Sequence, residues 1–144
     1  MNKPLLLSWL TAIIAVIGSL YFSEVMHYVP CTFCWYQRIL MYPLAVFLGV
    51  AFYHQDSRIA RYVLPLSVLG IFVSGYHIAL QKIPALQEFE VCTSGVPCSQ
   101  DYINWLGFIT IPMLAFTAFV IITVSMIILS KKDNRLAAGA ARKS

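Results

Sequence analysis

Four long apolar runs separated by short polar segments dominate the chain. Each run is close to or above the roughly 18 residues that a helix needs to cross the hydrocarbon core of a bilayer. A bilayer accepts only helices or closed barrels as spanning structures, and these runs lack the alternation of barrel strands. The pattern therefore predicts an all-α integral membrane protein, a four-transmembrane-helix bundle with helices at about residues 5–22, 35–53, 62–80 and 103–129.

The composition agrees with a membrane protein. Hydrophobic residues make up 60% of the chain and charged residues 11%, whereas an average soluble domain is about a quarter charged. The first run is expected to remain as a helix, because no small-x-small cleavage site of a signal peptide precedes Glu24. We predict a single membrane domain over residues 1–130 and a basic, Ala-rich cytoplasmic tail over residues 131–144 that is disordered at the membrane surface.

Lysine and arginine gather on one side of the predicted helices. That side carries Lys3, Arg58, Arg61, Lys131, Lys132, Arg135, Arg142 and Lys143, and the other side carries Arg38 and Lys82. Cytoplasmic segments of membrane proteins carry the excess of Lys and Arg, so we expect both termini in the cytoplasm of a multi-pass protein of the cell membrane. The net charge of +4 is then explained by topology. No nucleic-acid motif accompanies it, and a nucleic-acid partner is not expected.

The four cysteines form two pairs in the polar segments on the opposite side. Cys31 and Cys34 form a CxxC pair, and Cys92 and Cys98 are separated by five residues. The predicted topology places both pairs outside the cytoplasm, where disulfides form and persist. Two pairs that face the same compartment can pass a disulfide between them through mixed intermediates. The alternatives are a structural staple in the second loop and a zinc site, although this spacing in an oxidising compartment does not favour zinc.

The CxxC pair stands where an outer loop enters the second predicted helix. Unpaired amides and the positive end of the dipole at a helix N-terminus stabilise a thiolate, so Cys34 is the favoured redox thiol. Arg38 follows one turn later at the edge of the hydrocarbon, which indicates a nearby anionic group; the alternative is an arginine that extends to the lipid headgroups. His77 is expected at the same depth, able to hydrogen-bond a carbonyl or transfer a proton, or else a structural histidine of the bundle.

Electrons released by these thiols need an acceptor. No cysteine lies within a predicted helix interior or on the cytoplasmic side, and the chain has no CxxCH haem attachment site or nucleotide-binding fingerprint. A lipid-soluble quinone is therefore the simplest acceptor for a protein embedded in the membrane.

Several of these features together resemble the quinone-dependent disulfide bond formation proteins, DsbB in one lineage and BdbC in Bacillus-type organisms. The resemblance rests on residues 30–38 (PCTFCWYQR), residues 77–84 (HIALQKIP), the second cysteine pair and the four helices. The compact second loop is most similar to the short Bacillus-type disulfide formation protein C, and it leaves no room for a membrane-surface helix between Cys92 and Cys98.

The resemblance implies a reaction and a partner. A reduced thioredoxin-like oxidase outside the cytoplasm would attack the Cys92–Cys98 disulfide at Cys92, and Cys98 would then exchange with Cys31. Cys34 would donate to quinone from the membrane pool, assisted by Arg38 and His77. The Bacillus-type form implies menaquinone rather than ubiquinone. The order of exchange between the loops stays open because the second loop is short.

Two other functions fit part of the pattern. A vitamin K epoxide reductase-like protein also combines four helices, a CxxC pair and a loop pair, but in that family the loop pair precedes the CxxC pair along the chain. A structural or zinc-binding membrane scaffold accounts for the helices and leaves Arg38 and His77 unexplained.

Overall fold

The computed structural model describes residues 3–25, 27, 32–83, 85 and 111–143. Within these ranges four long helices form a bundle: α1 (Lys3–Leu20), α2 (Thr32–His54), α3 (Ala60–Lys82) and α5 (Ile111–Lys143). Two short helical turns adjoin them, the π-helical η1 (Tyr21–Val25) and the 3₁₀ turn η2 (Ser57–Ile59). Each long helix is long and apolar enough to cross a membrane. The predicted fold class, a bundle of four spanning helices, is therefore confirmed.

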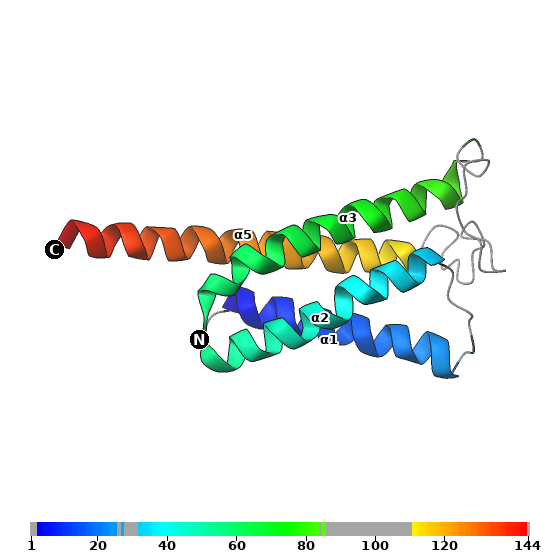
Figure 1. Cartoon of the computed structure of the whole chain (residues 1–144), viewed down its shortest axis with the longest axis horizontal. Helices are drawn as coiled ribbons and strands as arrows, with labels where there is room; N and C mark the ends of the chain where they lie inside the picture. The colour runs from blue at the N-terminus through cyan, green and yellow to red at the C-terminus, as the bar shows by residue number, and fades with distance from the viewer. Residues whose placement is uncertain (1–2, 26, 28–31, 84, 86–110, 144) are drawn as a thin grey trace.

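The observed boundaries of α1, α2 and α3 lie close to the expected ones, and α5 differs at its C-terminal end. The first part of the fourth predicted helix, residues 103–110, lies outside the described residues. At the other end, the tail expected to be disordered is helical through Lys143 and extends past the rest of the bundle (Figure 1). The tail is rich in Ala, Lys and Arg, which are strong helix formers, and it continues a helix that is already nucleated. Extending the helix therefore costs little, even without packing.

The helices follow one another around the bundle, and each packs against two neighbours. α1 lies against α2 and α5, and α3 lies against α2 and α5. Figure 1 shows the N-terminus and the α2–α3 connection at one end of the bundle, while α2 begins and α3 ends at the other. We call the second end the Cys34 end, because Cys34 lies in the first turn of α2. The connectivity therefore brings the start of α2 and the ends of α1 and α3 together.

Small residues allow close helix contact, as their helical spacing indicates. Ser8 and Ala12 of α1 are buried, and so are Ser67 and Ser74 of α3. Gly70 of α3 admits the Phe119 ring of α5, since a Cβ atom on Gly70 would lie 2.3 Å from a ring carbon. Thr123 of α5 donates a hydrogen bond of 3.0 Å to the hydroxyl of Ser67. These contacts fix α3 closely against α5.

The end of the bundle opposite Cys34 is held by polar contacts of the α2–α3 connection. Asp56 accepts a hydrogen bond of 2.9 Å from the backbone N–H of Arg58, which caps η2. The Ser57 hydroxyl donates to Asp133 of α5 at 2.7 Å. The hydrogen bond at Asp133 therefore ties α5 to the connection between α2 and α3.

Candidate functional site

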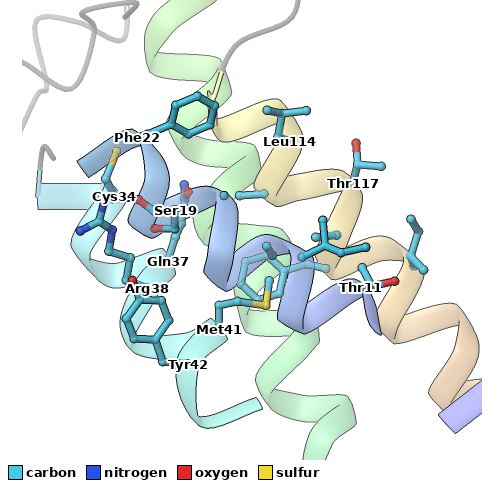
Figure 2. A pocket seen from close by; sticks show the side chains of 17 residues that line it. Thr11, Ser19, Phe22, Cys34, Gln37, Arg38, Met41, Tyr42, Leu114 and Thr117 are labelled. Carbon is cyan, nitrogen blue, oxygen red and sulfur yellow. Dashed lines mark hydrogen bonds between the residues drawn. The ribbon is translucent and has the colours of Figure 1, made fainter. Parts of the chain in front are cut away.

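A cavity of about 570 Å³ lies between α1, α2 and α5, and Cys34 forms part of its wall. Figure 2 shows Cys34, Gln37, Arg38 and Tyr42 along α2, and α1 and α5 supply apolar side chains together with the hydroxyls of Thr11, Ser19 and Thr117. The α2 wall consists of Cys34, Gln37, Arg38, Met41 and Tyr42. Gln37, Arg38, Met41 and Tyr42 stand three, four, seven and eight residues after Cys34. All five residues therefore share one face of the helix. Cys34, the predicted redox thiol, thus stands beside an apolar space within the part of the fold that is long and apolar enough to span a membrane.

Cys34 is half-buried in the first turn of α2. The N-terminal amides of α2 and its dipole favour a thiolate at this position. Cys34 and Phe22 both line the cavity, and Figure 2 labels them at the same end of it. The other three cysteines, Cys31, Cys92 and Cys98, lie outside the described residues. The geometry of disulfide exchange therefore stays a prediction.

Arg38 is half-buried and held against the end of α1. Its guanidinium donates to the Ser19 carbonyl oxygen at 3.1 Å and to the Ser23 hydroxyl at 3.4 Å. Its Cζ atom lies 5.3 Å from the centroid of the Trp35 ring, a cation–π distance. The carbonyls at a helix C-terminus carry partial negative charge, so the end of α1 stabilises the guanidinium. The guanidinium thus belongs to the wall of the cavity.

The end of α1 has the geometry that this contact uses. The chain leaves the α-helix after Leu20 and forms a π-helical turn, which contains Ser23. π-Turns change the direction of carbonyl groups and occur frequently at functional sites. The last turn of α1 supplies the Ser19 carbonyl oxygen and the π-turn supplies the Ser23 hydroxyl, and one guanidinium reaches both.

His77 lies behind Gln37 and does not line the cavity itself. It is 1% exposed, and its Nδ1 atom is 3.0 Å from Nε2 of Gln37, which is 6% exposed. In this orientation the amide nitrogen of Gln37 donates and Nδ1 of His77 accepts. The Phe33 ring packs 5.7 Å from the imidazole, between centroids. Gln37 thus links His77 to the cavity.

The structure brings together Cys34, Arg38 and, through Gln37, His77. Two further residues of the wall, Gln37 and Tyr42, were not singled out from the sequence. Their signal was present in the helical spacing, because Gln37 and Tyr42 stand three and eight residues after Cys34. Spacing alone gives the shared face, and it does not reveal that this face borders a cavity.

Comparison with known proteins gives a consistent result. Residues 2–129 match the sequence model of the family described as disulfide bond formation protein DsbB. Disulfide bond formation protein C of Bacillus subtilis (strain 168) is 53% identical over 127 residues, which cover 88% of this chain and 92% of the relative. The probable disulfide formation protein C of Halalkalibacterium halodurans is 52% identical over 126 residues, covering 87% and 92%. The Bacillus cereus (strain ATCC 14579) protein of the same description is 48% identical over 127 residues, covering 88% and 91%. No solved structure gave a significant match.

Proposed function

Since this chain belongs to the DsbB family of disulfide bond formation proteins, we propose that the cavity beside Cys34 is its quinone site. Members of the family are membrane thiol–disulfide oxidoreductases that act with quinone and oxidise a thioredoxin-like partner. The chain is accordingly a quinone-dependent enzyme of disulfide formation. Membership in this family favours neither the vitamin K epoxide reductase-like alternative nor the membrane scaffold.

The cavity suits a quinone in size and chemistry. Small-molecule sites are commonly about 300–1,000 Å³ and mostly apolar with a few placed polar groups. The walls from α1 and α5 include Ile14, Leu114 and Phe119, which suit a ring and an isoprenoid chain. Hydrogen-bond donors come from Gln37, Arg38 and Tyr42 on the α2 side, where a ring with carbonyl oxygens needs them. The observation that carries the proposal is Cys34 in the wall of this space beside a guanidinium.

Three residues of the α2 wall, Cys34, Arg38 and Gln37, have a stated part in this proposal. When bound, quinone accepts two electrons and two protons. The Cys31–Cys34 dithiol releases that number of each as it becomes a disulfide, and Cys34 is the thiol at the cavity. Arg38 carries five N–H groups, of which α1 takes two, so the guanidinium can also donate to a carbonyl oxygen. Gln37 hydrogen-bonds to His77, and this contact supports His77 as a proton-transfer group behind the cavity wall.

The outer part of the relay follows from the cysteine pattern. We propose that a reduced thioredoxin-like oxidase attacks the Cys92–Cys98 disulfide and that exchange with Cys31 regenerates it. The proposed location is the cell membrane with both cysteine pairs outside the cytoplasm. The basic residues of the α2–α3 connection and of the α5 extension support this orientation, because they lie at the end of the bundle opposite Cys34. Similarity to the Bacillus-type relatives supports menaquinone as the quinone.

Quinone absorbance under anaerobic conditions tests the proposal. Purified protein is given menaquinone and a reduced thioredoxin-like dithiol protein. We expect loss of the quinone absorbance with the wild-type protein and none with Cys34→Ser. A wild-type protein that leaves the quinone oxidised, while its cysteines react with the dithiol protein, would remove the quinone step from the function. Reduction that persists in Cys34→Ser would place the reacting thiol elsewhere.

A further inference from the structure

The hydroxyl oxygen of Tyr42 is buried and has no hydrogen-bond partner among the described residues. Tyr42 also belongs to the wall of the cavity between α1, α2 and α5. A buried hydroxyl nearly always finds a partner in a folded protein, and an unpaired one is costly where neither water nor another chain can pair with it. The hydroxyls of Ser8, Thr11 and Ser74 in the spanning helices, by contrast, donate to helix carbonyls. Tyr42 therefore differs from them.

The position of this hydroxyl connects it to the redox site. Cys34, Arg38 and Tyr42 follow one another at intervals of four residues, so they lie on one face of α2, each about 6 Å further along the axis. Long side chains of a helix lean toward its N-terminus. Figure 2 shows the Tyr42 ring extending from α2 toward Arg38. Its hydroxyl is thus directed to the part of the cavity that holds the guanidinium and the thiol.

We propose that Tyr42 donates a hydrogen bond to a carbonyl oxygen of the bound quinone, as a second donor beside Arg38. This inference rests on the quinone site proposed above. A quinone has two carbonyl oxygens on opposite edges of its ring, and both lose hydrogen bonds to water on entering an apolar cavity. A single donor group on one side would leave one of them unpaired. Among the donors of the α2 wall, the Tyr42 hydroxyl is the one without a partner among the described residues, and the ligand supplies the acceptor that it lacks.

A tyrosine hydroxyl also fits the product. Guanidinium groups only donate, whereas a hydroxyl both donates and accepts and can rotate between the two. The Tyr42 oxygen can therefore donate to a quinone carbonyl and accept from a quinol hydroxyl without a change in side-chain position. Tyr42 is in this sense a ligand-contacting residue for both oxidation states.

The variant Tyr42→Phe tests the proposal, because it removes the oxygen and keeps the ring. Tyr53→Phe is the matched control, since Tyr53 is 84% exposed at the opposite end of α2. With menaquinone of short chain length, we expect KM to rise about 3- to 10-fold in Tyr42→Phe, the range of one net hydrogen bond, and to stay within about twofold in the control. The infrared carbonyl band of bound quinone should shift to higher frequency in Tyr42→Phe only.

Thermal unfolding adds a measurement that needs no turnover. Without quinone, Tyr42→Phe should unfold at the same temperature as the wild type or higher, because an unpaired hydroxyl is removed. With saturating menaquinone the wild type should gain more stability than the variant. An unchanged KM with an unchanged carbonyl band would overturn the inference. So would a lower unfolding temperature without quinone, because it would reveal a partner for the hydroxyl inside the protein.

The outcomes for the two proposals are separable. If the wild-type protein is stabilised by menaquinone but does not reduce it, the proposed reaction fails and the binding difference between wild type and Tyr42→Phe still decides the role of Tyr42. If the wild type reduces menaquinone and Tyr42→Phe binds it equally well, the reaction stands and the Tyr42 contact is wrong. If menaquinone neither binds nor is reduced, both are overturned.

Discussion

Arg38 combines a structural contact with a place in the cavity wall. Its guanidinium bridges from α2 to the Ser19 carbonyl and the Ser23 hydroxyl at the end of α1. A planar group with donors on several edges can hold two contacts on one side and still donate on another. A lysine ammonium is a single point of charge on a flexible stem. Keeping the positive charge at this position is therefore not enough to keep its geometry.

Arg38→Lys is predicted to weaken quinone reduction. We expect kcat/KM for menaquinone to fall about 10- to 100-fold, the range for losing one hydrogen bond from a charged donor. Steady-state quinone reduction measures the change, and Arg58→Lys, at an exposed position in the α2–α3 connection, is the control. Unchanged kinetics in Arg38→Lys would remove Arg38 from the site.

The position of His77 illustrates what the sequence can and cannot predict about a single residue. The depth of His77 in the membrane was predicted by counting residues along an apolar run, and the predicted depth is the same as that of Cys34. Its direction does not follow, because α3 carries apolar residues on every side, so the pattern identifies no buried face. The structure turns His77 toward Gln37 of α2, and the amide of Gln37 is the group that meets the cavity.

The Gln37–His77 contact should be detectable as a coupling in stability. Gln37→Leu and His77→Phe each leave a buried polar group without its partner, and each should lower the free energy of unfolding by about 1–3 kcal/mol. The double variant should lose less than the sum, with a coupling of about 0.5–3 kcal/mol. Unfolding of the four proteins in detergent completes the cycle. Additive losses would mean that the two side chains do not interact in solution.

Among the helices, α1 contributes a wall that is unusually open at one position. Gly18 lines the cavity, and a Cβ atom added there would have no atom outside its own helix within 4 Å. Gly70 of α3 is the opposite case, because the Phe119 ring fills the space beside it. The two glycines look alike in the sequence, since each follows small residues at helical spacing. Only the packing separates a glycine that admits a neighbouring ring from one that borders an empty volume.

Gly18→Leu is predicted to occupy the cavity without disturbing the fold. The new side chain extends into open space and leucine favours a helix more than glycine does, so the unfolding temperature should not fall. KM for menaquinone should rise at least about 10-fold, since the added methyl groups take the volume of part of the ligand. Gly139→Leu is the control, because Gly139 also has open space around it but lies in the exposed extension of α5. A loss of activity shared by both variants would contradict the assignment.

At the scale of the whole molecule, the four spanning helices could be predicted because a bilayer imposes their length and requires paired backbone groups. The α5 extension could not be predicted in the same way. Its residues are polar and unpacked, so the apolar pattern ends near Leu129, while helix propensity and the preceding helix carry it to Lys143. The cavity was also beyond the sequence, because it arises from side chains of three helices whose rotations relative to one another are set by packing.

The orientation of the bundle in the membrane is open to a direct test. In a cysteine-free background, Gly139→Cys should be protected from a membrane-impermeant maleimide in intact cells and react after lysis, because the positive residues near it predict a cytoplasmic location. Native Cys92 and Cys98, after reduction, should react in intact cells. Labelling of the cysteine at position 139 in intact cells would reverse the proposed topology.

The cavity beside Cys34 is enclosed by α1, α2 and α5 within the part of the bundle that spans the membrane. If the cavity holds quinone as proposed, its lipid-soluble ligand reaches it by lateral diffusion in the bilayer. Its effective concentration is then the number of quinone molecules per lipid, which falls when more lipid or detergent is added at constant total quinone. For this enzyme the amphiphile in an assay is therefore a diluent of the substrate, and KM acquires a physical meaning only as a mole fraction.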